Sequence, residues 1–367
     1  MNSHAGNIGQ SKWDLDTPAL VIDVPAMERN IARMDAFFAD KKAKLRPHAK
    51  THKCPTISHK QLAAGHAVGI TCAKLGEAEA LAAAGIKDIL IANQIVGPQK
   101  IARLMGLAHQ ADVMVAVDDP VNVEQLSAAA VDAGVRLRVL VEVNIGMNRC
   151  GVEPGEPALE LARKVAEAKG LRFMGLQGYE GHLVMHPNLD ERRQRTLAAM
   201  KSLVDTRHLI EGAGLEVTIV SGGGTGTYDI TGTIEGVDEV QAGSYVFNDV
   251  RYRSVGAHFD CALTVLATVI SRPTPTVAVT DAGHKVLTSE FGLPELIGVE
   301  GASLTRLSEE HGKVEFEAPN RDLRPGDKVE FIPSHGCTTI NLFDCYHVVR
   351  DDRLEAVWNI AGRGKSR

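Results

Sequence analysis

Short apolar runs, many of them rich in β-branched residues, alternate with alanine-rich segments of helical period along most of this chain. Such runs predict strands, and apolar residues spaced three to four positions apart predict helices. We expect strands at 45–47, 67–71, 88–92, 112–117, 137–143, 172–177, 216–220 and 239–242, after an earlier one at 19–23. We expect helices near 25–40, 56–65, 76–84, 98–109, 121–134, 157–169 and 190–213. Eight strand-helix units of this length predict a parallel sheet and fit a closed (β/α)8 barrel better than an open sheet.

The pattern changes after about residue 255. Short strands separated by Gly, Pro and Asp turns are expected at 263–270, 276–280, 285–288, 313–317, 328–332, 346–350 and 354–358. Strands that follow a βα series with few helices among them predict a second, antiparallel domain. We therefore expect a barrel domain at 1–255 and a C-terminal β domain at 256–367, with the first 18 or so residues assignable to either.

Composition points to a small-molecule partner. The formal net charge is −6, and basic runs with interleaved aromatic residues are missing, so there is no electrostatic case for nucleic acid or an anionic membrane. Apolar runs fall short of the ~20 residues that span a bilayer, and the polar start of the chain lacks the core of a signal peptide. The six cysteines are irregularly spaced and form no CxxC pair. We expect a cytoplasmic protein with reduced thiols.

Lys50 is the first candidate for chemistry. It stands in the segment 46–55, among Arg46, His48, His52 and Lys53, just after an expected strand. Cationic neighbours lower the pKa of a lysine, and an amine that is neutral part of the time can attack a carbonyl. Lys50 is therefore a Schiff-base candidate, and the alternative is a solvated basic turn ahead of a helix.

A glycine-rich loop follows the seventh strand of the expected barrel. It contains Ser221, Gly222, Gly223, Gly224, Thr225 and Gly226, and the turn after strand eight contains Gly243, Ser244 and Tyr245. In barrels of this type the loops after strands seven and eight often bind phosphate, because glycine lets backbone N–H groups approach an anion. The alternative is a loop that needs positive φ angles. An activated lysine and a phosphate loop on one rim describe pyridoxal 5′-phosphate better than a nucleotide, because no P-loop or GxGxxG motif occurs.

Several motifs in the same order resemble the fold-type III, alanine racemase-like enzymes of the D-threonine aldolase and D-serine dehydratase group. The resemblance covers nearly the whole chain and is carried by 46–55, 148–152, 221–226, 241–245, 281–283, 310–312 and 333–335. It implies that Lys50 binds pyridoxal 5′-phosphate covalently and that the loop and turn described above hold its phosphate. It also implies that Arg149 and Tyr179 contact the pyridoxal ring or its oxygen. Their structural alternatives are a loop contact and a core residue. His48 and His52 are candidates to tune Lys50, and the alternative for His52 is a solvated side chain.

The resemblance gives meaning to His335 and Cys337, which by themselves are a weak metal motif. Imidazole and thiolate two residues apart can bind one metal ion, although a buried histidine beside an inert cysteine is the more common case. Members of the family carry a two-ligand metal site here, His-x-Asp in aldolases and His-x-Cys in dehydratases. A soft thiolate with an imidazole favours zinc, with manganese or magnesium as alternatives.

Cys337 is one departure from the aldolase pattern, and a second lies after the sixth strand. The last histidine of the family motif aligns with Met185, so its role passes to His182 or His186, or is missing. We expect a metal-dependent lyase of D-β-hydroxy-α-amino acids that cleaves D-threonine-type substrates to glycine and an aldehyde. A dehydratase of D-serine or D-3-hydroxyaspartate type is the first alternative, and an amino-acid racemase or a non-catalytic cofactor carrier follows. The family's dimeric sites imply a homodimer.

Overall fold

The computed structural model describes residues 7–367, which form two compact units. One unit contains residues 33–243 and 364–367, and the other contains residues 7–32 together with 244–363. The sequence predicted a single boundary near residue 255, whereas the parallel strand series ends earlier, at Val240. Helix α1 (Val24–Phe38) begins in the second of these units and ends in the first.

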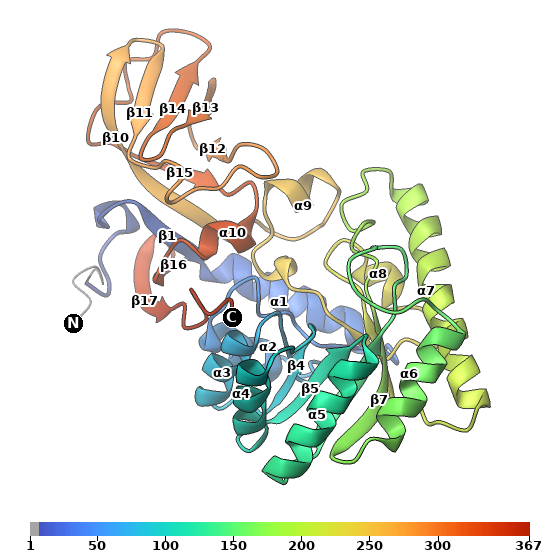
Figure 1. Cartoon of the computed structure of the whole chain (residues 1–367). Coiled ribbons are helices and arrows are strands. Elements are labelled where there is room, and N and C mark those ends of the chain that lie inside the picture. The colour runs from blue at the N-terminus through green and yellow to red at the C-terminus, as the bar shows by residue number, and fades with distance from the viewer. Residues whose placement is uncertain (1–6) are drawn as a thin grey trace. The chain divides into compact units, whose positions relative to one another are not determined.

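The first unit is the expected barrel (Figure 1). Its eight strands are all parallel, in the order β2-β9-β8-β7-β6-β5-β4-β3. They are β2 (Lys44–Leu45), β3 (Ile70–Cys72), β4 (Asp88–Ile91), β5 (Asp112–Val117), β6 (Leu137–Glu142), β7 (Leu171–Gly178), β8 (Ile219–Gly222) and β9 (Glu239–Val240). Parallel bridges from Leu45 to Ala67 and from His48 to Thr71 join the two ends of this order, so the sheet closes. The (β/α)8 prediction is confirmed.

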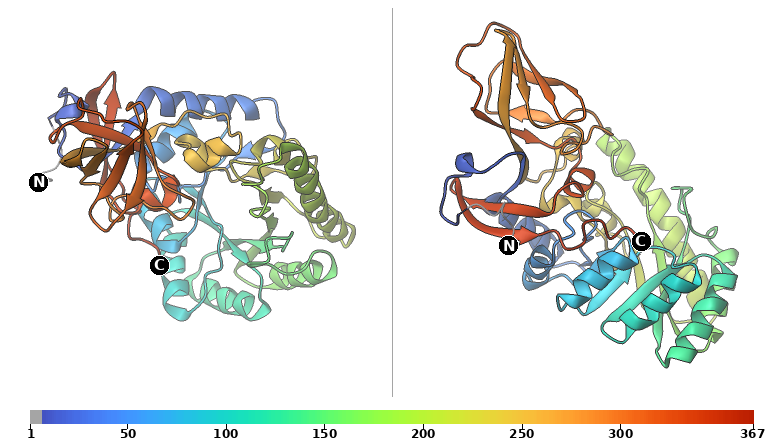
Figure 2. Two further views of the ribbon diagram at one scale, coloured as in Figure 1. Left: turned by 90° about the horizontal axis from the view of Figure 1, so that it is seen from above. Right: turned by 60° about the vertical axis from the view of Figure 1, so that its left-hand side comes forward.

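Helices connect successive strands of the barrel and surround it, as the view from above in Figure 2 shows. They are α2 (Pro55–Ala63), α3 (Leu75–Ala83), α4 (Pro98–Ala108), α5 (Pro120–Ala133), α6 (Glu156–Glu167), α7 (Leu189–Gly212) and the short α8 (Tyr228–Thr231). Proline occupies the first turn of α2, α4, α5 and α6, where its missing N–H costs nothing. The side chain of Asp119 caps α5 and that of Asn188 caps α7, which explains why these helices begin where they do.

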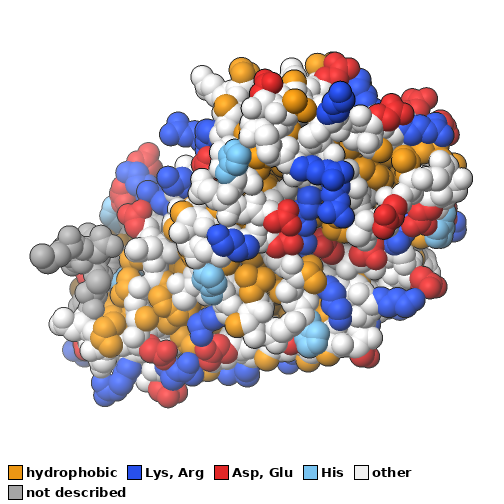
Figure 3. Space-filling model, turned by 90° about the horizontal axis from the view of Figure 1, so that it is seen from below, with side chains coloured by type: hydrophobic (Ala, Val, Ile, Leu, Met, Phe, Trp, Pro, Cys, Tyr) orange, Lys and Arg blue, Asp and Glu red, His pale blue; other side chains and the backbone are white. Residues whose placement is uncertain are grey.

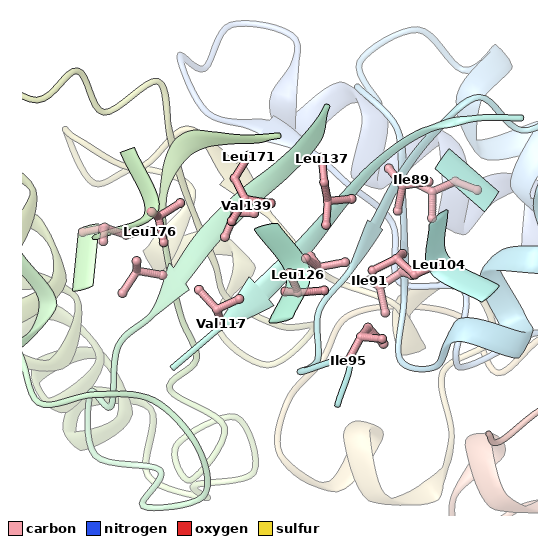
Figure 4. Packing of buried hydrophobic residues seen from close by; sticks show 14 of the residues in the cluster. Ile89, Ile91, Ile95, Leu104, Val117, Leu126, Leu137, Val139, Leu171 and Leu176 are labelled. Atoms are coloured by element: carbon pink, nitrogen blue, oxygen red, sulfur yellow. The ribbon is translucent and has the colours of Figure 1, made fainter. Parts of the chain in front are cut away.

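Alternate residues of the barrel strands β4 to β8 belong to two different buried clusters. Ile89, Ile91, Val117 and Val139 point outward and pack against the helices, together with Leu104 of α4 and Leu126 of α5 (Figure 4). The residues between them face inward, and a separate buried cluster of Leu90, Met114, Leu140, Met174 and Ile219 fills the interior. This alternation follows from the period of two in a strand, and it makes the barrel a packed core rather than a pore.

The second unit is built on antiparallel strands. One path runs β13-β14-β11-β10-β1-β16-β17, and β15 pairs with both β10 and β12. The strands are β1 (Ala19–Asp23), β10 (Leu263–Thr274), β11 (Val277–Thr280), β12 (Glu295–Ile297), β13 (Ala302–Leu307), β14 (Gly312–Phe316), β15 (Lys328–Ile332), β16 (Cys345–Arg350) and β17 (Arg353–Asn359). The short helical elements of this unit are η1 (Lys12–Asp14), η2 (Ser244–Val246), α9 (Val250–Ser254) and α10 (Gly336–Ile340).

Two expectations for this unit were wrong. Strand β1, which the sequence placed with the barrel, pairs antiparallel with β10 and parallel with β16. Its first four residues, 19–22, are apolar and buried, which suits the middle of that sheet. The segment 285–288 forms a turn rather than a strand. The N–H groups of Val286 and Leu287 both donate to the carbonyl of Gly283, which closes the chain on itself and leaves no strand geometry.

The surface carries charges of both signs. On the face shown in Figure 3, basic and acidic side chains lie next to one another. Over residues 7–367 we find no helix whose length and apolar character would let it cross a membrane.

Candidate active site

The turn that carries Lys50 continues β2 beyond its last paired residue. The N–H of His48 donates to the carbonyl of Ala242 (3.0 Å), and the N–H of Ala49 donates to that of Thr71 (2.8 Å). The backbone is therefore held on both sides up to residue 49, at the carboxyl end of the strand. Lys50 follows directly and is half-buried. The structure thus places this lysine on the barrel rim where function is expected.

A buried ion pair fixes the end of the same turn. Lys53 has a φ angle of 52°, in the left-handed region, and its N–H donates to the carbonyl of Ala49 at 2.7 Å. Its amine pairs with the carboxylate of Glu77, and the two residues are 8% and 3% exposed. Glu77 also accepts the N–H groups of Ala73 and Lys74 at the start of α3. Because its amine is bound in this buried ion pair, Lys53 is not available for the reactive role assigned to Lys50.

Lys50 lines a pocket of the barrel unit. The residues that line it are His48, Lys50, Ala92, Glu142, Arg149, Gln177, Tyr179, Gly223 and Gln241. The Nζ atom of Lys50 lies 5.9 Å from the centre of the Tyr179 ring, and the guanidinium carbon of Arg149 lies 5.8 Å from it. Both cations therefore contact one aromatic ring. The structure brings together five residues that the sequence singled out from four separate segments.

Two histidines of the Lys50 turn are kept neutral by their surroundings. Burial, followed by the charge of Lys50, holds the pKa of His48 well below its ordinary value. Burial also lowers the pKa of His52 to about 4, against the opposing side-chain hydrogen bond to Gln61, and the Cys54 N–H keeps one ring nitrogen an acceptor. That N–H donates to Nδ1 of His52 at 3.1 Å, so Nε2 carries the proton and donates to Gln61 at 3.2 Å. His52 is a buried structural residue rather than a solvated one.

This burial predicts a pH-dependent stability. His52 is protonated below about pH 6.5 in the unfolded chain but only below about pH 4 in the folded chain. Between these values the unfolded state binds more protons, so the free energy of unfolding falls as the pH falls. The expected loss is about 1.4 kcal/mol per pH unit for this residue. The variant His52→Asn keeps an acceptor for the Cys54 N–H but cannot be protonated. Urea unfolding at about pH 7 and about pH 5 should show a shallower dependence for the variant, and equal slopes would contradict this account.

Three polar side chains that the sequence analysis did not single out as site residues also line the pocket, namely Glu142, Gln177 and Gln241. Burial raises the pKa of Glu142, and nearby Asp118 raises it further, against a hydrogen bond from Gln94 to its carboxylate at 2.6 Å. Gln177 also hydrogen-bonds to Glu142, and Gln241 donates to the Oε1 atom of Gln177 at 3.0 Å. A shared signal could have revealed Asp118, Glu142, Gln177 and Gln241, because each stands at or just beyond the carboxyl end of a barrel strand.

The Gly-rich loop is organised by a carboxylate. Glu180 is fully buried and accepts the N–H of Gly223 (3.2 Å) and the hydroxyl groups of Thr227 (2.7 Å) and Thr231 (2.6 Å). The N–H of Gly224 donates to the Thr227 hydroxyl at 3.2 Å. Two loop amides are thus engaged within the protein, so the predicted phosphate cradle has fewer backbone donors than its glycine content suggested.

Glycine is required in this loop for two different reasons. Gly223 has a φ angle of +75°, which side-chain-bearing residues rarely adopt. A Cβ atom on Gly226 would lie 1.9 Å from the carbonyl oxygen of Val184, so the backbones there are too close for any side chain. Ser221 and Thr225 are buried, and Ser221 accepts a hydrogen bond from Gln241. Gly222 approaches Gly178 in the same way, because a Cβ atom added to Gly222 would lie 2.3 Å from the carbonyl oxygen of Gly178.

The turn after β9 divides between the two units. Gly243 belongs to the barrel, and a Cβ atom there would lie 2.7 Å from the carbonyl oxygen of His48, so glycine permits the close packing of the Lys50 turn. Ser244 and Tyr245 belong to the other unit. Tyr245 is fully buried and its ring packs at 5.7 Å from that of Phe259, which is a core contact.

The two candidate replacements for the family histidine do not line the pocket of the barrel unit. His182 is exposed and packs over Gly146, and burial followed by the charge of Arg195 lowers its pKa. His186 stands just before α7, where its Nδ1 lies 3.2 Å from the carbonyl of Asn188 and its Nε2 lies 3.5 Å from Glu191. The structure therefore gives His186 a local contact at the start of a helix.

The predicted metal pair meets at the start of α10 in the second unit. The Nδ1 atom of His335 lies 2.9 Å from the carboxylate of Asp249, and His335 also hydrogen-bonds to Cys337. Burial alone would lower the pKa of His335, but Cys337 and Asp249 together raise it to about 10. A carboxylate on one ring nitrogen is the usual support of a metal-binding histidine, because it orients the other nitrogen toward the metal.

These contacts fit a metal site with few protein ligands. Within the described range of 7–367, no three His, Cys, Asp or Glu side chains come together to hold an ion. His335 and Cys337 could offer two ligands to a metal ion, an imidazole nitrogen and a thiolate. Asp249 was missed by the sequence analysis, and its separation of 86 positions from His335 explains why.

Two family models match the chain. One describes the alanine racemase N-terminal domain and matches residues 22–250. The other describes a putative serine dehydratase domain and matches residues 262–349.

Relatives match over the whole length. The D-threonine aldolase of an Arthrobacter species is 40% identical, over 96% of this chain and 94% of its own. The 3-hydroxy-D-aspartate aldolase of Paracoccus denitrificans is 36% identical, over 97% and 94%. The crystal structure of D-threonine aldolase from Filomicrobium marinum matches with a TM-score of 0.94 and 41% identity, over 98% of this chain and 99% of the other. The chain therefore belongs to the alanine racemase-like family of pyridoxal-phosphate enzymes, in the group of the D-threonine and hydroxyaspartate lyases, and it is a lyase of that family.

Proposed function

We propose that the protein cleaves D-β-hydroxy-α-amino acids of the D-threonine type into glycine and an aldehyde. The observation that carries the proposal is the pocket in which Lys50, Arg149, Tyr179 and Gly223 meet at the rim of the barrel. The aldolases among the relatives support cleavage of the Cα–Cβ bond as the reaction.

The residues of the pocket divide the work of holding the cofactor. Pyridoxal 5′-phosphate, when bound, supplies an electron sink for the bond that breaks at the substrate α carbon. Lys50 would bind it covalently, and Arg149 and Tyr179 would hold its ring. His48, kept neutral by burial and by Lys50, adds no positive charge that would compete with the amine. The closed turn 49–53 keeps Lys50 in position to receive or return a proton at the substrate α carbon.

His335 and Cys337 would hold a divalent metal, with zinc favoured by the thiolate and manganese or magnesium as alternatives. Such an ion supplies a Lewis acid that lowers the pKa of the substrate β-hydroxyl. Asp249 orients His335 for this role through the 2.9 Å contact to Nδ1. One solved relative supports the involvement of a cysteine, because a cysteine-to-alanine mutant of D-threo-3-hydroxyaspartate dehydratase is described as metal-free.

Dehydration is the second candidate, and Cys337 is the observation that favours it. The D-threo-3-hydroxyaspartate dehydratase of a Delftia species is 31% identical, over 94% of this chain and 97% of its own. The two reactions start from the same substrates and differ in the bond that breaks. Cleavage needs a base for the β-hydroxyl proton, whereas dehydration needs the α-proton to leave and the hydroxide to depart.

Product analysis separates the two reactions. We expect the purified protein, supplied with pyridoxal 5′-phosphate and a divalent metal, to convert D-threonine into glycine and acetaldehyde. Chromatography of derivatised amino acids would detect glycine, and an aldehyde-coupled assay would detect the second product. D-Serine and D-threo-3-hydroxyaspartate are tested in parallel. A 2-oxo acid and ammonia without glycine would overturn aldol cleavage in favour of dehydration, and D/L interconversion alone would indicate a racemase.

A further inference from the structure

We propose that Glu180 is a positioning residue for the phosphate end of the cofactor, because its carboxylate fixes the shape of the Gly-rich loop. This inference rests on the proposed use of pyridoxal 5′-phosphate and extends it to a residue outside the pocket lining. Glu180 directly follows Tyr179, whose ring contacts both Lys50 and Arg149. It is thus placed between the ring-binding and loop-forming parts of the barrel rim.

The contacts of Glu180 all lead to the loop and the short helix after it. Its Oε2 atom accepts the N–H of Gly223, and its Oε1 atom accepts the hydroxyl groups of Thr227 and Thr231. Glu180 and both threonines are fully buried. A carboxylate taken out of water is tolerated only when its oxygens are hydrogen-bonded, and three donors meet that need here. Glu180 therefore fastens residues 223, 227 and 231 to the end of β7.

The connection reaches the pocket through Gly223 and Gly224. Gly223 lines the pocket and keeps its left-handed backbone while its N–H is held by Glu180. The Thr227 hydroxyl donates to Glu180 and accepts the N–H of Gly224, so Glu180 also acts on Gly224 through one threonine. Loss of the carboxylate would release two successive loop amides. The loop would then no longer be preorganised for an anion.

The sign of the charge supports a positioning role over direct binding. A carboxylate repels a phosphate dianion, so Glu180 gains nothing for the cofactor by electrostatics. Its value lies in geometry, since an ionised carboxylate accepts hydrogen bonds only and can take an N–H and two hydroxyl groups at once. A substitution that weakens these hydrogen bonds should affect the phosphate end of the cofactor and leave the ring end unchanged.

The test compares two ligands that differ only in the phosphate. Dissociation constants for pyridoxal 5′-phosphate and for pyridoxal are measured by absorbance titration of the full-length, cofactor-depleted protein and its variants. Thr231→Val removes one hydroxyl donor without touching the loop, and we expect it to weaken pyridoxal 5′-phosphate binding about three- to tenfold. Glu180→Gln keeps one acceptor oxygen, and we expect about tenfold or more. Binding of pyridoxal should change less than about twofold in both variants.

Thr206→Val is the matched control, because Thr206 is also buried and donates its hydroxyl to the carbonyl of Ser202, in a different part of the barrel unit. It should bind both ligands as the unchanged protein does. Equal weakening of both ligands in Thr231→Val and Glu180→Gln would mean general damage to the fold and would overturn the inference, as would unchanged phosphate-dependent binding. If the unchanged protein forms no covalent complex with either aldehyde, the proposed function itself fails instead.

Discussion

Replacing Lys50 with alanine should abolish the visible absorbance of the protein-bound cofactor and lower the lyase rate by about 10³-fold or more, as expected for loss of a group that acts directly on the reacting atoms. The reason is that no neighbouring amine can take its place. Lys53 is the nearest candidate in sequence, and its amine is buried in the ion pair with Glu77. Absorbance spectra of the purified variant test the loss of the bound cofactor. Borohydride reduction of the unchanged protein, followed by peptide mass spectrometry, locates the modified lysine.

The matched control is Lys87→Ala, which removes an exposed lysine of the same unit whose amine contacts only the carbonyl of Gln110 among its described hydrogen bonds. This variant should keep the absorbance and the activity. Far-ultraviolet circular dichroism distinguishes loss of the amine from loss of the fold, since Lys50 is half-buried and alanine suits its turn. A coloured, active Lys50→Ala protein would contradict the assignment of this lysine at its first step.

Removing either predicted metal ligand should remove most of the bound metal and most of the activity. We expect His335→Ala and Cys337→Ser to purify with little divalent metal and to lose lyase activity about 10²-fold or more. Asp249→Asn is the finer probe, because asparagine can still accept the Tyr252 N–H that caps α9 but loses the charge facing His335. Loss of such a supporting carboxylate typically costs about 10- to 100-fold in metal affinity. Inductively coupled plasma mass spectrometry measures the metal content.

The control for thiol chemistry is Cys345→Ser, since Cys345 lies at the start of β16 in the same unit and burial raises the pKa of its thiol. This variant should keep its metal and its activity. Treatment of the unchanged protein with a chelator, followed by readdition of zinc, manganese or magnesium, identifies the preferred ion. Full activity of His335→Ala after exhaustive chelation would show that the pair is structural and that the reaction proceeds without a metal.

The barrel was predictable because its signals are local. Apolar residues spaced with a period of two predict its strands, and those with a period of about 3.6 predict its helices. The eight expected strands correspond to strands β2 to β9. The second unit was harder to predict because its strands are short and pair across long stretches of chain. Strand β1 shows the difficulty, since its partners begin more than 240 residues later, at Leu263 and at His347.

The site was predictable only in part, for a related reason. Lys50 and the Gly-rich loop carry motifs, so the sequence singled them out and the structure brings Lys50, Arg149, Tyr179 and Gly223 into one pocket. Glu180 directly follows the candidate Tyr179 in sequence and still revealed no role, because its three donors come from a segment 43 to 51 residues further along.

The sequence by itself determined the barrel, the succession of its strands and helices and the lysine at its rim, because periodicity and motifs depend on residues that are close together in sequence. Only the tertiary structure decided which polar groups support that lysine and its loop. The chain Glu142–Gln177–Gln241, the buried Lys53–Glu77 pair and the contact of Asp249 with His335 join positions that are far apart in sequence. Such pairs have no pattern of their own, since closure of the sheet and packing of the strands create the contacts.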